Sequence, residues 1–164
     1  MKRFLPVLLC LAILASCVSG EKGRQVKAAA DLIERVTPGY SKQFELTIIP
    51  AQENDVYGWR AGNGKVELMG NNTISLAVAY YNYLKEYCKI NMSWCGDQMN
   101  LPAQLPLPQE EFMGKINAKW RVYLNYCSCS YSAAWWDWER WQKELDFMAM
   151  NGINMPLSIV GLGG

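Results

Sequence analysis

The stretch WWDWERWQKELDFMAMNG, residues 135–152, decides how the C-terminal part of the chain folds. Its apolar residues recur at helical spacing and form a stripe that is expected to be core: Trp135, Trp138, Trp141, Leu145 and Met148. The opposite side is charged and is expected to face solvent; it consists of Glu139, Arg140, Lys143 and Asp146, bordered by Asp137 and Glu144. The pattern predicts an amphipathic helix, with Ser132 as a candidate N-cap and Asn151-Gly152 as its end.

Apolar segments flank this helix on both sides. Residues 120–125 (WRVYLN) and 153–160 (INMPLSIV) predict two strands. Strand, loop, helix and strand make one βαβ unit, whose strands are expected to pair in parallel and to be covered on both faces. Two strands cannot bury themselves, so either this unit is a piece of a larger barrel or sheet, or partners supply the rest. In a barrel, the loops at the carboxyl ends of the strands form the active site.

The preceding residues 24–100 predict a small α+β domain. Its predicted elements are a helix over 24–37 that ends at Pro38-Gly39, a strand over 44–49, a hairpin formed by 56–60 and 65–69, and an apolar helix over 74–88. The hairpin signal is strong, because Gly62-Asn63-Gly64 tolerates positive φ at the turn. Residues 101–118 begin with LPAQLPLP, whose three prolines predict an extended linker, and the second domain, 119–164, follows it.

Residues 1–17, MKRFLPVLLCLAILASC, predict a secretory signal. Lys2 and Arg3 form its basic start, and the apolar run that follows is shorter than the ~20 residues that a membrane span needs. Its end, Leu14-Ala15-Ser16-Cys17, is similar to a bacterial lipobox, and a polar tether over 18–25 follows. We therefore expect a lipid anchor on Cys17 and a place in the bacterial cell envelope, periplasmic or surface-facing. The alternative is an ordinary signal peptide with a chance cysteine.

The composition excludes several other classes of protein. The chain of 164 residues has no histidine, so His-based triads, metal sites and general bases are ruled out for it. The net charge of +1 disfavours nucleic-acid binding, and 51% hydrophobic residues are too many for a disordered chain. The cysteines lack zinc-like spacing, so no metal site is predicted, whereas a disulfide between Cys88 and Cys95 is left open.

Residues 121–161 carry motifs that resemble the start of the catalytic domain of glycoside hydrolase family 89, the α-N-acetylglucosaminidases. The motifs are Asn125-Tyr126-Cys127, Ser130-Tyr131-Ser132, Trp135-Trp136-Asp137-Trp138 and the run from Phe147 to Asn154. The resemblance extends over residues 24–160 and includes the family's small domain ahead of its barrel. It implies an α+β N-terminal domain followed by the first βαβ unit of a truncated (β/α)8 barrel.

The resemblance also implies a function. Members of this family remove terminal α-linked N-acetylglucosamine from glycans with retention, using two glutamates, and no cofactor is expected. In retaining glycosidases the two carboxylates are about 5–5.5 Å apart. The matching positions are expected beyond Gly164, so no catalytic residue is assigned here. Asn125, Cys127 and Tyr131 match positions that line the family's sugar pocket, with packing of the loop as the alternative role.

The end of the sequence departs from the family pattern, because Leu162-Gly163-Gly164 stands where members continue with glutamine and an acidic residue. We therefore expect the chain to be an N-terminal piece of an exo-acting α-N-acetylglucosaminidase that is inactive by itself. Its expected partners are a glycan with terminal α-linked N-acetylglucosamine and, through the lipid anchor, a membrane. The alternative is a non-catalytic, lipid-anchored glycan-binding or vestigial protein.

Overall fold

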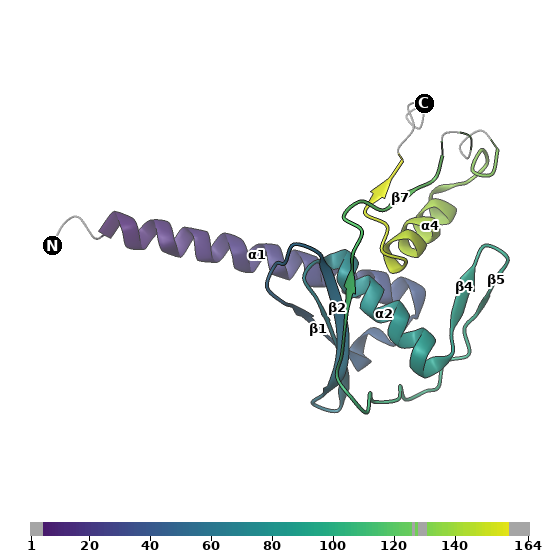
Figure 1. The fold of residues 1–164 in the computed structure, drawn as a ribbon, viewed down its shortest axis with the longest axis horizontal. Coiled ribbons are helices and arrows are strands. Elements are labelled where there is room, and N and C mark those ends of the chain that lie inside the picture. The colour runs from purple at the N-terminus through teal and green to yellow at the C-terminus, as the bar shows by residue number, and fades with distance from the viewer. Residues whose placement is uncertain (1–4, 126, 128–130, 158–164) are drawn as a thin grey trace.

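The computed structural model describes residues 5–125, 127 and 131–157, with side chains from residue 20 onward. Two groups of elements follow one another along the chain (Figure 1). The first consists of α1 (Leu5–Val36), η1 (Ser41–Gln43), β1 (Phe44–Ile48), β2 (Asp55–Gly62), β3 (Lys65–Gly70), α2 (Thr73–Cys88), β4 (Asn91–Ser93), β5 (Gly96–Gln98) and β6 (Phe112–Ile116). The second consists of β7 (Val122–Tyr123), α4 (Trp138–Met150) and β8 (Met155–Pro156). Several positions singled out in the sequence lie outside the described residues: Lys2, Arg3, Tyr126, Ser130, residues 158–164 and the side chains of residues 14–17.

A four-stranded sheet in the order β1-β3-β2-β6 forms the base of the first group. β2 and β3 are the predicted hairpin, and Asn63 and Gly64 have φ angles of 48° and 74°, which confirms the interpretation of the Asn-Gly turn. β1 pairs with β3 in parallel, and β6 pairs with β2 in antiparallel fashion. β6 lies within residues 101–118, which the sequence predicts as a linker. The sheet extends to Ile116 because the extended chain after the prolines hydrogen-bonds to the edge of β2.

α2 is the centre of the hydrophobic core. Asn72 caps its N-terminus, since the side-chain oxygen accepts a hydrogen bond of 2.9 Å from the backbone N–H of Ser75. The sequence predicts one apolar stripe on this helix, but α2 is buried over most of its circumference, because it contacts the sheet, α1 and α4. Its tyrosines belong to the core: Tyr80 and Tyr83 are fully buried, and both rings pack edge-on against Phe44 of β1.

α1 is longer than the helix predicted over residues 24–37. It runs without a break from Leu5 to Val36, and Figure 1 shows its N-terminal part projecting away from the other elements. The predicted tether over 18–25 is helical, because its polar residues support the helix. The Glu21 carboxylate accepts hydrogen bonds from Arg24 and Gln25, three and four positions further on. Among the described residues, no helix is both long enough and apolar enough to cross a membrane.

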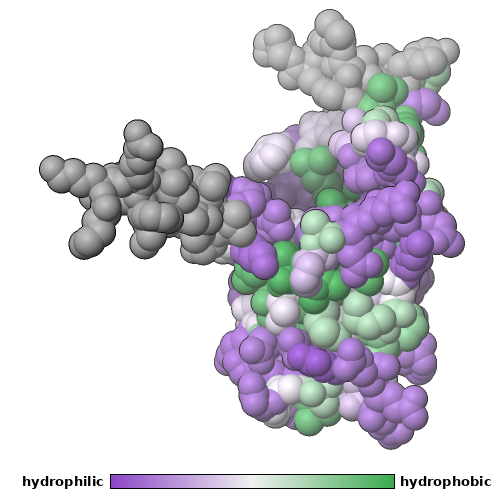
Figure 2. All heavy atoms as spheres, turned by 60° about the vertical axis from the view of Figure 1, so that its left-hand side comes forward, coloured by the Kyte–Doolittle hydropathy of each residue, from purple (hydrophilic) through white to green (hydrophobic). Residues whose placement is uncertain are grey.

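The surface beside α1 is mixed in polarity. Figure 2 shows hydrophilic residues over much of its lower part, with apolar residues gathered in a band next to the place where α1 joins the domain.

On the sheet, Arg60 of β2 and Thr47 of β1 both donate to the Glu67 carboxylate of β3, at 2.7 and 2.8 Å. The hydrogen bond from Arg60 is the main reason that the pKa of Glu67 lies below its ordinary value, although burial of this carboxylate acts in the opposite direction.

β7 and β8 pair in parallel, and α4 connects them along the chain. β7 is shorter than the predicted segment 120–125, and within the described residues 153–157 the strand β8 covers Met155 and Pro156. α4 begins at Trp138 rather than near Ser132, since the Asp137 carboxylate caps it by accepting a hydrogen bond of 2.8 Å from the backbone N–H of Arg140. The end of the helix is as predicted, because Gly152 adopts a φ of 78°, in the left-handed region that favours glycine.

The orientation of α4 differs from the orientation that the sequence predicts. Glu144 and Asp146, expected at or beside a solvated face, are buried, with 1% and 7% of their surface exposed. Trp138 and Leu145, expected in the core, are 67% and 41% exposed. Of the predicted apolar stripe, Met148 is buried at 3% exposure. The charged side of α4 therefore packs against the first group of elements, and much of its apolar side is open.

Polar partners from the first group explain this orientation. Arg35, near the C-terminal end of α1, donates two hydrogen bonds of 2.6 and 2.8 Å to Asp146. Trp94, at the turn between β4 and β5, donates its indole N–H to both oxygens of Glu144, each at 3.0 Å. A buried carboxylate is stable only with such partners. The periodicity of α4 does not reveal them, because they are distant in the sequence.

Candidate functional site

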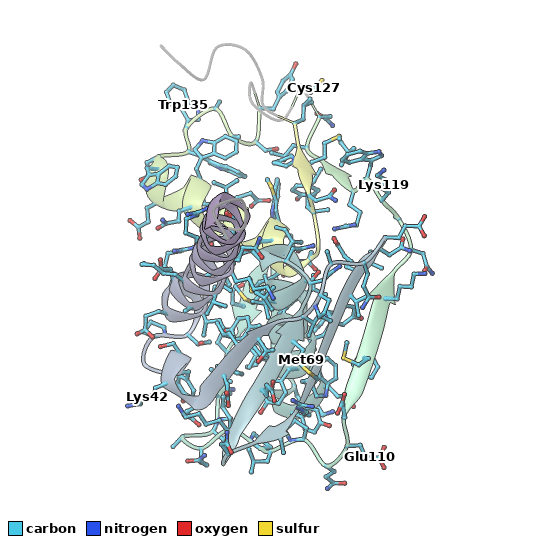
Figure 3. The ribbon with its side chains drawn as sticks, turned by 90° about the vertical axis from the view of Figure 1, so that its left-hand side faces the viewer. Lys42, Met69, Glu110, Lys119, Cys127 and Trp135 are labelled. Atoms are coloured by element: carbon cyan, nitrogen blue, oxygen red, sulfur yellow. The ribbon has the colours of Figure 1, made fainter. Side chains whose placement is uncertain are left out.

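The candidate site lies at the carboxyl end of β7, where the sequence places Asn125, Cys127 and Tyr131. Leu124 has a φ of 68°, in the left-handed region that a non-glycine residue rarely adopts, so the chain turns sharply as the strand ends. Figure 3 shows Cys127 at the end of the molecule opposite to Lys42. The three residues therefore follow the strand end, on the side that a barrel uses for its active site.

All three residues are exposed. Tyr131 is 79% exposed, and Cys127 carries a free thiol. The backbone N–H of Tyr131 donates to the carbonyl of Cys127 at 3.2 Å, so the chain brings these two residues together. An amide, a thiol and a phenol near one another offer hydrogen-bond donors, acceptors and an apolar ring face, and a sugar presents the complementary hydroxyls and C–H surface.

Arg121, directly before β7, fixes this strand to the first group of elements. Its guanidinium ion-pairs with the Asp55 carboxylate and also donates to the carbonyl of Gly152. The Asn154 side chain accepts from the backbone N–H of Arg121 and donates to the carbonyl of Lys119, both at 2.9 Å. These contacts hold the start of β2, the start of β7 and the chain before β8 together, just upstream of the candidate site.

An apolar cleft lies between α4 and the ends of β7 and β8. Its volume is about 320 Å³, and it is lined by Leu124, Trp138, Trp141, Leu145, Met148, Pro156 and Leu157. None of these lining residues is titratable, so the cleft offers packing surface rather than acid–base chemistry.

A second cavity, of about 580 Å³, lies between the end of α1, the β4–β5 hairpin and α4. Three of its four carboxylates serve the fold: Asp97 ion-pairs with Lys143 at 2.7 Å, Asp146 ion-pairs with Arg35, and Asp137 caps α4. The hydrogen bonds that Arg35 donates to Asp146 are the main reason that the pKa of Arg35 lies above its ordinary value. Carboxylates held in this way are poor candidates for the acid and the nucleophile of a glycosidase, which must reach the substrate.

Glu144, which the sequence places at the border of the solvated side of the helix, is the most deeply buried carboxylate among the described residues. Arg140 donates to it at 2.8 Å, in addition to Trp94. Burial raises the pKa of the Tyr123 hydroxyl, and the neighbouring charge of Glu144 raises it further. The sequence gives no signal for the contact with Trp94, since the two residues are 50 positions apart.

The cysteines and acidic residues bear on the remaining sequence interpretations. Cys88, Cys95 and Cys127 are free thiols, so Cys88 and Cys95 are not joined. Burial raises the pKa of the Cys88 thiol. Within the part of the chain that the structure describes, no three Cys, Asp or Glu side chains gather as a metal site would require.

Comparison with known proteins gives the same family for both parts of the chain. The N-terminal domain of α-N-acetylglucosaminidase matches residues 27–107, and the TIM-barrel domain of the same enzyme matches residues 121–163. Human α-N-acetylglucosaminidase is 33% identical over 153 residues, which make up 90% of this chain and 21% of the human protein.

Solved structures extend this similarity to the fold. A family 89 glycoside hydrolase from Clostridium perfringens, in complex with 2-acetamido-1,2-dideoxynojirmycin, has a TM-score of 0.83 and 30% identity, over 88% of this chain and 17% of that one. A form of that enzyme with two glutamate-to-glutamine substitutions, in complex with its substrate GlcNAc-α-1,4-galactose, has a TM-score of 0.81 and 32% identity, over 89% of this chain and 17% of that one.

The small domain and the strand–helix–strand segment after it define the class, which is the N-terminal region of a glycoside hydrolase. The chain belongs to the α-N-acetylglucosaminidase family, glycoside hydrolase family 89. It spans about a fifth of the length of the relatives that it matches.

Proposed function

We propose that this chain is the N-terminal region of a retaining exo-α-N-acetylglucosaminidase. The observation that carries the proposal is that both parts of the chain match one family of enzymes, at 30–33% identity to human and clostridial members. The substrate of the clostridial enzyme, GlcNAc-α-1,4-galactose, favours a glycan with terminal α-linked N-acetylglucosamine.

In this proposal β7, α4 and β8 are the first strand, the first helix and the second strand of the barrel. The parallel pairing of β7 with β8 supports the assignment. The open apolar side of α4 supports it as well, because each helix of a (β/α)8 barrel buries its apolar side against the strands. Further strands would then fill the 320 Å³ cleft beside Trp138 and Leu145.

Asn125, Cys127 and Tyr131 line part of the sugar pocket in this proposal. Asn125 would hydrogen-bond to sugar hydroxyls, and the Tyr131 ring would cover the C–H face of the sugar with its hydroxyl at the rim. Their position after β7 and their exposure support these roles. The catalytic pair belongs to two glutamates outside residues 1–164, so the chain by itself is expected to be inactive.

The test is an assay with a chromogenic α-N-acetylglucosaminide. The chain alone should give no turnover, and a polypeptide that continues into a complete family barrel should hydrolyse the α-linked but not the β-linked substrate. Asn125→Ala and Tyr131→Phe should raise KM, because each removes a hydrogen-bonding group from the pocket. Asn91→Ala, an exposed asparagine on β4, is the matched control and should leave KM unchanged. A complete barrel that binds the sugar without turning it over would favour a non-catalytic glycan-binding protein.

We also propose that Cys17 carries a lipid anchor in the bacterial envelope, on the strength of the lipobox-like Leu14-Ala15-Ser16-Cys17. Cys17→Ala should release the protein from membranes in cell fractionation, whereas Cys10→Ala, within the predicted signal, should leave it membrane-bound. Membrane association of Cys17→Ala at the level of the parent would rule the anchor out.

A further inference from the structure

Glu144 connects three elements that lie apart in the sequence. Its side chain is 1% exposed, and its two oxygens accept the indole N–H of Trp94 from the β4–β5 turn. Tyr123 of β7 lies near the same carboxylate. Burial is the main reason that the pKa of the Tyr123 hydroxyl is raised, and the charge of Glu144 raises it further. Arg140, one turn earlier on α4, supplies the compensating charge. Glu144 is therefore one of the carboxylates at which the N-terminal domain meets the segment from β7 to β8, together with Asp146 and Asp55.

From Glu144 the contacts continue to the turn that carries Tyr131. The Arg140 guanidinium stacks over the Trp136 ring at 3.9 Å from its centroid while it holds Glu144. The Trp136 ring packs edge-on against Trp94 at 5.6 Å. The backbone N–H of Trp136 donates to a carbonyl within the preceding turn, that of Ala133, at 3.2 Å. Trp136 therefore directly follows the turn over residues 131–135, and this hydrogen bond joins the two.

The β4–β5 hairpin contributes little to the core. Nearly all of its residues are exposed, and half of the Trp94 surface is open to solvent, at 51%. Its backbone is joined to α2 at Met92, which exchanges hydrogen bonds with the Tyr81 hydroxyl. Its polar side chains instead contact α4: Trp94 binds Glu144, and Asp97 ion-pairs with Lys143 at 2.7 Å. Because the side chains of this exposed hairpin bind α4, the hairpin is suited to fixing the orientation of α4. Packing of apolar side chains alone does not explain the position of the hairpin.

We propose that Trp94 and Glu144 are positioning residues for the sugar pocket. The hairpin of the N-terminal domain fixes Glu144, Glu144 fixes Arg140, and Arg140 fixes Trp136 at the end of the turn that carries Tyr131. The inference rests on the proposed function, because the pocket role of Tyr131 is assigned there. It adds that the N-terminal domain sets the affinity of the enzyme for sugar without touching the sugar.

The proposed link is the series of contacts that leads from Trp94 to the turn with Tyr131. It is tested first in this chain, without any sugar. Trp94→Phe keeps an aromatic ring but removes the N–H donor, and Trp120→Phe is the control, since Trp120 is 62% exposed and contacts Lys119 instead. With 5-fluorotryptophan in the protein, Trp94→Phe should shift the Trp136 resonance and change the alkylation rate of the Cys127 thiol about three- to tenfold. Trp120→Phe should change neither. An unchanged Cys127 rate in Trp94→Phe overturns the link, whatever the resonance does.

Glu144→Gln is the second variant, because it keeps the shape and one acceptor for Trp94 while it removes the charge that holds Arg140. It should shift the Trp136 resonance even where Trp94→Phe lowers the yield of folded protein, and an unchanged resonance contradicts the proposal.

In the polypeptide with a complete barrel, Trp94→Phe should raise KM about three- to tenfold with little change in kcat. If the parent shows no turnover, the proposed function fails while the alkylation test still decides the link. If the parent turns over and KM is unchanged in Trp94→Phe, the inference fails alone.

Discussion

α2 and α4 both contain apolar residues at helical spacing, but they meet opposite surroundings. α2 lies against the sheet, α1 and α4, and its Tyr80, Tyr83 and Leu84 are fully buried. α4 meets the same domain with its charged side, through Glu144 and Asp146, and leaves much of its apolar side beside an open cleft. The side of a helix that is buried therefore depends on the partner present, since a polar partner surface buries a polar side.

The largest expected difference in stability comes from replacing one leucine by alanine on each helix. Leu84→Ala in α2 removes a side chain that is 1% exposed and should lower the free energy of unfolding by about 2–5 kcal/mol. Leu145→Ala in α4, at 41% exposure, should cost less than about 1 kcal/mol. Urea denaturation measures both. Equal losses would mean that the apolar side of α4 is already covered in this chain.

The next contrast concerns ion pairs. Arg121→Met leaves the largely buried Asp55 carboxylate without its ion-pair partner, with only the hydrogen bond from Asn72, and should cost about 2–3 kcal/mol. The control is Arg24→Met, whose ion pair with Glu21 is exposed and should be worth less than about 1 kcal/mol. Thermal unfolding followed by circular dichroism compares the two. A small effect of Arg121→Met would show that the junction does not depend on this pair.

Helix caps give a smaller effect and test whether both helices depend on local signals. Asn72→Ala removes the cap of α2 and Asp137→Ala the cap of α4, so each should cost about 1 kcal/mol. The loss should be greater at Asn72, since its amide also donates to Asp55 at 2.6 Å. Urea denaturation of both variants checks the order, and a greater loss at Asp137 would reverse it.

The smallest effect is a pH dependence within the sheet of the first domain. The pKa of Glu67 is lowered in the folded protein, chiefly by the hydrogen bond from Arg60, so this contact stabilises the fold above the ordinary carboxyl value of 4.5 and is lost as the pH falls through the lowered pKa. Glu67→Gln should therefore be less stable than the parent at pH 7, and the difference should shrink below pH 4.5. Glu45→Gln, at the exposed cross-strand neighbour, is the control. A difference that grows in acid contradicts this assignment.

Local signals predict much of the first domain. The Asn63-Gly64 turn fixes the β2–β3 hairpin through positive φ, and the apolar run after Asn72 becomes α2. The sequence does not reveal that β6 joins the sheet, because three prolines precede it and its partner strand lies more than fifty residues earlier. Strand pairing between distant segments carries no local signature.

The candidate site also has a part that the sequence predicts and a part that it does not. Its three residues follow from the family resemblance and the end of β7, whereas the contacts that hold their surroundings do not. The partners of Glu144 and Asp146 come from Trp94 and Arg35, 50 and 111 positions away. A charged face on a helix is usually solvated, so periodicity favoured the wrong side of α4. In this structure the charged side of α4 is buried instead, at the place where the two parts of the chain meet.

The central proposal is that the residues that follow β7 (Asn125, Cys127 and Tyr131) form part of a pocket for N-acetylglucosamine. The direct measurement is the alkylation rate of Cys127, an exposed free thiol, followed by peptide mass spectrometry in a polypeptide with a complete family barrel. The ligand 2-acetamido-1,2-dideoxynojirmycin, bound by the clostridial relative, should slow alkylation of Cys127 and leave that of Cys95 unchanged. Galactose should protect neither thiol. An identical Cys127 rate with and without a saturating amount of this ligand would contradict the account.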